Sequence, residues 1–257
     1  MLSVFIIGNG KIAHHLVQAF LKTDVQIAGV YGRDIAKVNS FAAKYQIPAY
    51  SDLSKIPAQC DVYFLTVSDQ VIKLISEQVK VQGLLVHCSG MMPISVLQNH
   101  THYGSFWPIQ SFSENNMVDF KNIPICIEAS SEEDSRILEA LADRISRKVQ
   151  IVNQDQRQSL HLAAVLVNNF SNHLFVLAAA FLESKSISFD LLKPLIEETV
   201  NKINYMEPRY AQTGPAIRND IATIDMHKKA LAENLPLLHI YDVLSRSIIE
   251  HKDNSNE

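Results

Sequence analysis

The sequence is poor in cysteine, in net charge and in uninterrupted apolar runs. Its three cysteines, Cys60, Cys88 and Cys126, show no C-x-x-C spacing and no nearby pair of histidines, so neither a disulfide framework nor a zinc site is predicted. The formal net charge is -4, and the Lys and Arg residues are scattered along the chain. The chain therefore has no concentration of positive charge that would bind a polyanion such as nucleic acid. We expect no metal and no nucleic-acid partner.

Long apolar segments are also missing. A membrane span needs about twenty consecutive apolar residues, and no window of about eighteen is free of polar interruption. The richest run, LFVLAAAFL at residues 174–182, follows Asn168, Asn169, Asn172 and His173, which is typical of a buried helix. The chain enters a strand-like run, MLSVFII, without a basic leader or a small-residue cleavage site. We expect a cytoplasmic protein that makes no contact with a membrane.

The first 150 residues alternate short apolar runs with amphipathic ones. The chain has 257 residues, 47% of them hydrophobic, so it can bury one large core or two modest ones. Strands are predicted at 2–7, 25–31, 61–67, 84–87, 104–107, 123–128 and 149–152, and helices at 11–22, 34–45, 70–79 and after Ser131. This alternation favours the α/β class, with a Rossmann-like, mostly parallel sheet covered by helices on both faces.

From Asn153 onward the pattern is helical throughout. Helices are predicted at about 154–183, 189–204 and 236–250, and another opens at TGPAIRND, residues 213–220. We therefore expect a dinucleotide-binding Rossmann-like domain at 1–152, followed by an all-α C-terminal domain for substrate binding and dimerisation at 153–257. A helical domain of about 100 residues has a limited interior, so a homodimer through these helices is expected.

A glycine turn follows the first predicted strand. The stretch VFIIGNGKIA places Gly8 and Gly10 before the first helix, with Ala13 at the small-residue position of the pattern G-x-G-x-x-G/A. Gly8 permits the sharp turn, and Gly10 lets the backbone approach a pyrophosphate at the positive end of the helix. Because the turn opens a β-α-β unit, we interpret it as a dinucleotide site. The alternative is a structural tight turn.

The end of the second predicted strand, GVYGRD, carries a positive charge. Folds that bind NAD place an acidic residue there for the ribose hydroxyl, whereas this chain has Arg33, 23 residues after Gly10. A guanidinium can bind the 2'-phosphate of NADP through paired hydrogen bonds, and Gly32 leaves room above the strand. The alternative is that Arg33 is solvated and Asp34 caps the next helix. We expect NADP as the cofactor.

Two further strand ends, TVSD at 66–69 and HCSG at 87–90, are predicted to face the same crevice. Their small and hydroxyl side chains would let a nicotinamide ribose approach, although short polar residues are common in any β-α loop. The residues expected to contact the cofactor are Gly8, Asn9, Gly10, Lys11, Ile12, Gly32, Arg33, Thr66, Val67, Ser68, Ser89 and Gly90.

Seven segments together carry a family resemblance. They are GNGKIA, YGRD, TVSD, HCSGMMP, GSFWPIQSF, HLAAVLVNNFSNH and QTGPAIRNDIATIDMHKKAL. In this order they resemble a bacterial family of NADP oxidoreductases that joins a Rossmann-like domain to a helical C-terminal domain of unknown function. The chain is more distantly similar to pyrroline-5-carboxylate reductase, ketopantoate reductase and the deazaflavin-dependent NADP reductases. The resemblance implies a cleft between two domains, a dimer through the helices, and hydride transfer from NADPH to a small C=O or C=N substrate.

Polar side chains recur on the predicted helix that starts at residue 154. His161, Asn168 and Asn172 stand at i, i+7 and i+11, which is one face at 3.6 residues per turn, and Asn169 is close by. These groups are costly to bury alone, so they indicate either a polar cleft or a hydrogen-bonded network at a domain or dimer contact. In relatives that reduce hydroxy-acid precursors, a Lys one turn before an Asn donates the proton. If Asn169 is that Asn, the Lys position here is Val165, and His161 is our substitute donor.

The stretch TGPAIRND is predicted to open a helix, with Thr213 as its cap and Pro215 in its first turn. Arg218 would receive a substrate carboxylate as a bidentate pair, or else form a surface ion pair with Asp220. The residues predicted to act in catalysis are His161, Asn169, Asn172, Arg218 and Asp220.

The sequence therefore predicts an NADPH-dependent oxidoreductase that transfers a hydride to a small carbonyl substrate, such as a 2-oxo acid of the ketopantoate type. In that prediction His161 donates a proton while asparagine side chains hold the substrate oxygen. Two alternatives stay open. One is an imine reductase of the pyrroline-carboxylate type, and the other is a non-catalytic NADP-binding sensor whose helical domain reports cofactor occupancy.

Overall fold

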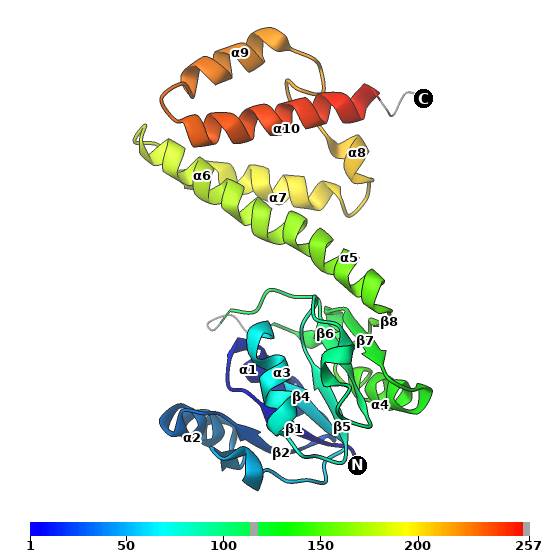
Figure 1. The fold of residues 1–257 in the computed structure, drawn as a ribbon. Coiled ribbons are helices and arrows are strands. Elements are labelled where there is room, and N and C mark those ends of the chain that lie inside the picture. The colour runs from blue at the N-terminus through cyan, green and yellow to red at the C-terminus, as the bar shows by residue number, and fades with distance from the viewer. Residues whose placement is uncertain (114–117, 254–257) are drawn as a thin grey trace. The chain divides into compact units, whose positions relative to one another are not determined.

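The structure is a computed structural model that describes residues 1–113 and 118–253. It divides into two compact units, Met1–Asn169 and Phe170–Glu257 (Figure 1). The sheet ends at Ile151, next to the predicted domain boundary at 152. The division between the units lies inside the following helical stretch, Gln154–Glu183, so this stretch belongs to both units.

One eight-stranded sheet organises the first unit. Its order is β3-β2-β1-β4-β5-β6-β7-β8, and every neighbouring pair is parallel except β6 with β7. The mostly parallel Rossmann-like sheet is thus confirmed, and its strand order reverses between β1 and β4, where such sheets bind ligands. The strands are β1 Ser3–Ile7, β2 Gln26–Tyr31, β3 Ala49–Tyr50, β4 Val62–Leu65, β5 Leu84–His87, β6 Tyr103–Pro108, β7 Ile125–Ala129 and β8 Val149–Ile151.

Helices cover both faces of the sheet. Because successive strand residues point to opposite faces, Val4 and Ile6 enter one core while Phe5 and Ile7 enter the other. The first core contains residues of α1, α2 and α4, and the second contains residues of α3. The bounds are α1 Lys11–Phe20, α2 Ile35–Tyr45, α3 Asp69–Gln78 and α4 Glu132–Ala142, with short 3-10 helices η1 Leu53–Lys55, η2 Ile94–Leu97 and η3 Phe120–Asn122.

Local capping explains where two of these helices begin. The Asp34 carboxylate accepts hydrogen bonds from the amides of Ala36 and Lys37 at the start of α2. The Ser131 hydroxyl accepts one from the Asp134 amide, and three acidic residues fill the first turn of α4, which complements the helix dipole. The predicted start of α4 is thus confirmed.

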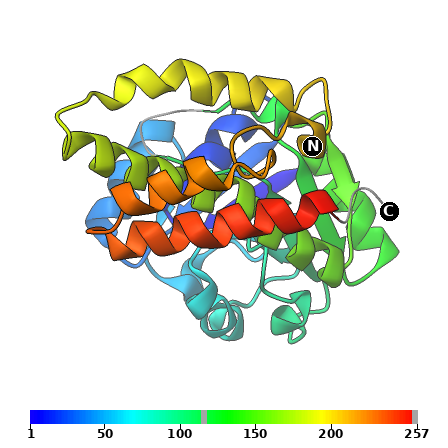
Figure 2. The same ribbon diagram turned by 90° about the horizontal axis from the view of Figure 1, so that it is seen from above.

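After β8 the described residues form helices joined by turns and loops, without a strand. Helix α5 Gln154–Ala164 continues through a π-helical segment, η4 Val165–Phe170, into α6 Ser171–Glu183. The others are η5 Phe189–Leu192, α7 Lys193–Lys202, α8 Pro208–Ala211, α9 Ile221–Ala230 and α10 Leu235–Asp253. Helices α9 and α10 lie side by side (Figure 2), joined by a hydrogen bond between His227 and Tyr241 and an ion pair between Lys228 and Asp242.

The predicted helix start at TGPAIRND is wrong in detail. Residues 214–219 form turns, and α9 begins only at Ile221, where the Asp220 carboxylate accepts a hydrogen bond from the Thr223 amide 3.1 Å away. Thr213 caps nothing in this helix. Asn219 has a φ of 55°, a left-handed conformation that breaks a helix and that asparagine tolerates better than most residues.

The stretch Gln154–Glu183 has an unusual apolar character. Its 30 residues include an 18-residue window with a mean hydropathy of 1.5, so by length and composition alone it is able to cross a membrane. None of that window is buried within the chain. Between Arg157 and Glu183 it carries no Asp, Glu, Lys or Arg. The expected buried helix is therefore exposed in the single chain and presents an uncovered apolar surface.

Candidate functional site

The turn after β1 has the geometry that a nucleotide-binding turn needs. Gly8 has a φ of 120°, a conformation that side chains rarely adopt. A Cβ atom at Gly8 would lie 2.7 Å from Thr66 Oγ1 and 2.8 Å from the Thr66 carbonyl oxygen. The Gly8 amide donates to the Tyr31 carbonyl at 2.8 Å, which ties the turn to the end of β2. Glycine at this position is therefore required by both conformation and space.

Gly10 plays a different part in the same turn. It is exposed and forms the amino end of α1, and no side chain caps the helix there. A Cβ atom built at Gly10 would meet no other atom within 4 Å. The first amides of α1 thus face open space, where they and the helix dipole can bind an anion. This open approach fits a pyrophosphate.

A cavity of about 380 Å³ opens at this turn. It lies where the strand order reverses, and Arg33 at the end of β2 is one of its walls. Arg33 is exposed and takes part in no ion pair within the described residues, so its guanidinium can receive a phosphate. Asp34 caps α2 at the same time, so the two alternatives for GVYGRD are compatible. The predicted cofactor residues that line the cavity are Gly8, Asn9, Gly10, Gly32, Arg33, Thr66, Val67 and Ser68.

Four predicted cofactor residues lie outside this lining. Lys11 is exposed at the first position of α1, and Ile12 packs against the sheet core, so only its backbone is at the helix end. Ser89 is buried, and its hydroxyl donates to Asp69 at 2.8 Å. A Cβ atom at Gly90 would lie 2.9 Å from both the His161 and Trp107 rings, so Gly90 packs against two residues that line the neighbouring cavity.

The second cavity, of about 400 Å³, lies between β6 and the helix that follows the sheet. The His161 ring meets the Trp107 ring edge to face, with 5.7 Å between ring centroids. No described residue that lines the cavity carries a formal charge other than His161 when it is protonated. Its walls are Trp107, Ile109, Gln110, Ser111, His161, Ala164, Val165, Val167, Asn168 and Asn169. Of the polar residues predicted to share one helix face, His161, Asn168 and Asn169 line this cavity and Asn172 does not; their roles in catalysis stay predictions.

The π-helical segment determines how these asparagines are presented. Asn168 and Asn169 both line the second cavity, although they are consecutive, and the Asn168 amide contacts the Asn169 side-chain oxygen at 3.5 Å. A π-helical turn contains more residues than an α-helical turn, so the predicted spacing of i, i+7 and i+11 does not hold through Val165–Phe170. Asn172 lies beyond this segment, in the second unit.

Arg218 and Asp220 also belong to the second unit. Asp220 is occupied as the cap of α9, and its hydrogen bonds from Thr223 lower the pKa of its carboxyl group. Arg218 is exposed and forms no ion pair with Asp220 within the described residues, so the predicted surface pair is not observed. The roles of these two residues in catalysis stay predictions.

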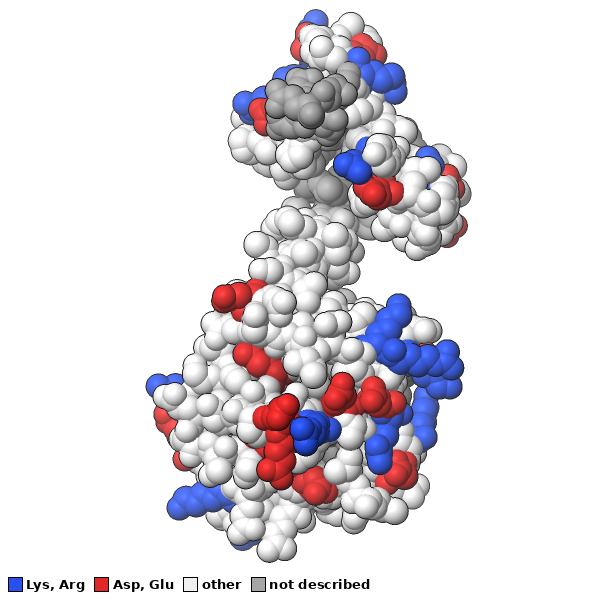
Figure 3. Space-filling view, turned by 90° about the vertical axis from the view of Figure 1, so that its right-hand side faces the viewer, with Lys and Arg blue, Asp and Glu red and all other residues white. Residues whose placement is uncertain are grey.

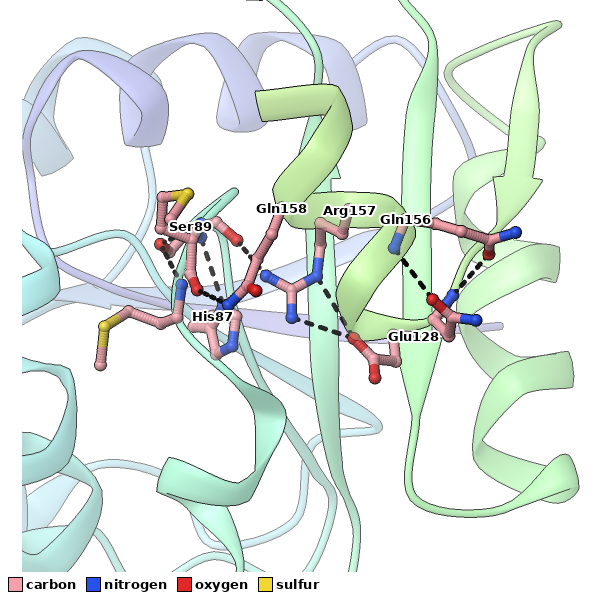
Figure 4. A network of polar contacts seen from close by, with 9 residues as sticks. His87, Ser89, Glu128, Gln156, Arg157 and Gln158 are labelled. Carbon is pink, nitrogen blue, oxygen red and sulfur yellow. Dashed lines mark hydrogen bonds and ion pairs between the residues drawn. The ribbon is translucent and has the colours of Figure 1, made fainter. Parts of the chain in front are cut away.

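Sequence reasoning missed a buried polar network beside the second cavity. Arg157 is fully buried, and its guanidinium donates to Glu128 Oε2 at 2.9 Å and to the Ser89 carbonyl at 3.1 Å (Figure 4). Burial, and secondarily the charge of Arg157, lowers the pKa of His87 to about 3, which keeps that imidazole neutral. The pairing could not be found in the sequence, because 29 residues separate Glu128 from Arg157.

No group of metal ligands accompanies these cavities in the described ranges. Three or more His, Cys, Asp or Glu side chains do not come together there in a way that could hold a metal ion. The second cavity offers an imidazole and side-chain amides to a small molecule. The first cavity offers backbone amides and a guanidinium to a nucleotide.

Comparison with protein families divides the chain into two parts. Residues 2–87 match an oxidoreductase family with an NAD-binding Rossmann fold. Residues 123–248 match a domain of unknown function, DUF2520. No curated protein sequence matches the chain significantly.

Three solved structures resemble the chain over nearly its whole length. A putative NADP oxidoreductase from Bacteroides fragilis is 38% identical, with a TM-score of 0.88 over 97% of this chain and 98% of that one. An imine reductase from Myxococcus stipitatus in complex with NADP+ is 14% identical, with a TM-score of 0.70 over 96% and 94%. 1-Pyrroline-5-carboxylate reductase from Streptococcus pyogenes is 11% identical, with a TM-score of 0.65 over 97% and 98%. The last two likenesses concern the fold.

Proposed function

We propose a substrate class for this chain, which belongs to the NADP oxidoreductase family of the Bacteroides fragilis protein. The chain is an NADP-dependent reductase with a Rossmann domain. We propose that it reduces a small compound with a C=N bond, held in the cavity beside Trp107 and His161. The single observation that carries this proposal is the pairing of a nucleotide cavity with a neutral, amide-lined cavity within the same unit.

A short chain of contacts joins the two cavities. Ser68 lines the nucleotide cavity, and the adjacent Asp69 accepts a hydrogen bond from Ser89. Gly90 follows Ser89 and touches His161 and Trp107. A nicotinamide held at the ends of β4 and β5 would therefore be close to the second cavity. This is the arrangement that hydride transfer requires, because both reactants must be held in contact.

The residues of this chain would perform the remaining tasks of the reaction. NADPH, when bound, supplies the hydride. Arg33 would hold its 2'-phosphate, and the amino end of α1 would hold its pyrophosphate. His161 would give a proton to the substrate nitrogen, while Asn168 and Asn169 orient it through hydrogen bonds. The Trp107 ring would form an apolar wall that excludes water.

The choice of C=N over C=O has two supports. The fold neighbours include an imine reductase and a pyrroline-carboxylate reductase, both named for reactions at a C=N bond. The second cavity also lacks an Arg or Lys among its described walls, so it suits a substrate without a carboxylate, such as a simple cyclic imine, better than a 2-oxo acid, whose carboxylate needs a cation. We therefore rank the carbonyl prediction below the imine one.

Oxidation of NADPH, followed at 340 nm, tests the proposal. We expect turnover with 1-pyrroline, and a fall in kcat of about 100-fold or more in His161→Gln, which matches the usual contribution of a general acid. His100→Gln is the matched control, because His100 contacts the Ser76 carbonyl near the amino ends of the strands and a glutamine amide can replace that contact. Tight NADPH binding without turnover of any imine or carbonyl would instead support the sensor alternative.

We further propose that a second copy of this chain covers the apolar face of Gln154–Glu183. Its exposed side chains include Leu162, Val167 and Phe170, of which Val167 is 74% exposed. Charged side chains of both signs lie elsewhere on the face drawn in Figure 3. The amides at Asn168 and Asn169 are costly in hydrocarbon, so a protein partner suits this stretch better than a membrane. The measurement that decides is the molar mass in solution.

A further inference from the structure

Arg157 is the largest fully buried side chain among the residues whose burial is described. It lies near the start of α5, and Figure 4 shows its guanidinium between two elements of the sheet. On one side Nε and Nη2 donate to Glu128 Oε2 on β7, at 3.3 and 2.9 Å. On the other side Nη1 donates to the Ser89 carbonyl, just after β5, at 3.1 Å. One side chain therefore fixes the start of α5 to two strands.

The contact between Arg157 and Ser89 is followed, one turn further along α5, by a contact between His161 and Gly90. Arg157 and His161 are four residues apart and lie on the same face of α5. Ser89 and Gly90 are consecutive, and Gly90 lies so close to His161 and Trp107 that even a Cβ atom would not fit. Any rotation or sliding of α5 that broke the contact of Arg157 with Ser89 would also move His161 away from Gly90.

The Ser89 loop is held from its other side as well. The Ser89 hydroxyl donates to Asp69 and accepts from the amides of Met91 and Met92, at 3.1 and 3.0 Å. Gln158, the neighbour of Arg157, donates to the Met91 carbonyl at 2.9 Å (Figure 4). These hydrogen bonds fix the conformation of the Ser89 loop and join it to the start of α5.

Energetics give a reason to assign Arg157 a positional role. A buried ion pair recovers little net stability, because the loss of solvation offsets the attraction, and apolar replacement of both partners together is often neutral, whereas loss of one partner alone is costly. The pair between Arg157 and Glu128 adds specificity of geometry instead, since a planar guanidinium can make its two sets of hydrogen bonds in only one orientation. That orientation determines the depth and rotation of the helix that carries His161.

We propose that Arg157 is a positioning residue that sets the His161 imidazole against Gly90 and Trp107. The inference rests on the proposed function only where turnover is concerned. Arg157 does not line the nucleotide cavity, where the pyrophosphate and 2'-phosphate contacts lie, so we expect its removal to change NADPH affinity little. Its effect on the reaction passes through His161.

The test compares Arg157→Met with Arg144→Met, a control that removes an arginine paired with Asp24 on the surface of the same unit. We expect both folded variants to bind NADPH within about 3-fold of the parent. Arg144→Met should melt close to the parent, whereas Arg157→Met leaves the largely buried Glu128 carboxylate unpaired and should melt well below it, so activity and emission are measured below the melting transition of each variant. Only Arg157→Met should lower kcat with 1-pyrroline, by about 10-fold or more. In a His161→Ala background the same change should lower kcat by less than about 2-fold, because residues that act as a unit are not additive.

A spectroscopic measurement decides the point without any substrate. Trp107 is the single tryptophan, so its emission reports the ring contact with His161. We expect the emission of Arg157→Met to move to that of His161→Ala, and the double variant to show no further change. Arg144→Met should emit like the parent. If Arg157→Met does not fold, Arg157→Lys replaces it, since an ammonium can keep Glu128 but not the fixed fork toward Ser89.

Three results would overturn the proposal. They are unchanged Trp107 emission in a folded Arg157 variant, additive losses of kcat in the double variant, and a loss of NADPH affinity in the folded variant as large as its loss of turnover. A parent protein that binds NADPH without reducing 1-pyrroline would count against the proposed function. The emission measurement would then still decide the positioning role.

Discussion

Substitution of Gly10 by alanine should separate nucleotide binding from folding. A Cβ atom at Gly10 meets nothing within 4 Å, and the φ of this residue is -83°, which alanine adopts freely. Two small effects oppose each other. Glycine is the better N-cap, by less than about 1 kcal/mol, while alanine restricts the unfolded chain by about 0.4 to 1 kcal/mol. The variant should therefore melt within a few degrees of the parent.

The effect of the same change on NADPH should be large. The new methyl group would occupy the open space through which a pyrophosphate approaches the amides of α1. Loss of two charge-assisted hydrogen bonds, at about 1.5 kcal/mol each, corresponds to an increase in Kd of about 100-fold. Isothermal titration calorimetry with NADPH measures Kd, and differential scanning calorimetry measures the melting temperature.

Gly8→Ala is the informative comparison. Its φ of 120° and the approach of 2.7 Å to Thr66 combine backbone strain with a clash. We expect a loss of about 3 kcal/mol or more of folding free energy, together with loss of binding. Parental affinity for NADPH in a folded Gly10→Ala protein would refute the assignment of the pyrophosphate to this turn.

Three further changes give distinct results. Arg33→Glu should raise the Kd for NADPH by about 100-fold with little effect on NADH, and equal changes for both would refute the 2'-phosphate contact. Because the folded pKa of His87 is about 3 and the unfolded value about 6.5, the unfolded chain binds more protons and stability falls as the pH drops through this window. The parent should therefore lose about 2 to 3 kcal/mol of unfolding free energy between pH 7 and 4.5 through His87, and His87→Asn should not show this part of the loss in urea unfolding. The same dependence of unfolding free energy on pH in the variant and the parent would contradict the burial of a neutral His87. Val167→Asp should halve the molar mass measured by light scattering. The control Ile35→Asp, at a 61% exposed position on another helix, should keep the molar mass of the parent. A Val167→Asp variant with the same molar mass as the parent would exclude this dimer face.

Much of the fold could be predicted because its signals are local. Period-two and continuous apolar runs located seven of the strands, and the glycine turn located the nucleotide cavity, since the turn, the helix end and Arg33 are fixed by a single β-α-β unit. The two-residue strand β3 was missed because it is too short to show a period. The caps at Asp34 and Ser131 were visible for the same reason of locality.

The second cavity was only partly predictable. His161, Asn168 and Asn169 stood out as polar residues on an apolar helix, but a straight α-helical period cannot represent a π-helical segment, whose single extra residue per turn has no reliable signature. The start of α9 was misplaced because Thr213 and Asp220 are both acceptable caps, and only the tertiary structure selects Asp220. Arg157 has no local signal that marks it as buried, because its partners Glu128 and Ser89 are distant in the sequence.

The two cavities are held by different parts of the first unit, and this has a consequence for specificity. Arg33 and the glycine turn are attached to β1 and β2, whereas His161 and its asparagines are attached through Arg157 to β5 and β7. Among the described residues, a side-chain hydrogen bond from Ser89 to Asp69 links the two sides. Cofactor choice and substrate chemistry should therefore vary independently. Arg33→Glu combined with Arg157→Met should show additive effects on Kd and kcat, because sites without shared partners combine additively.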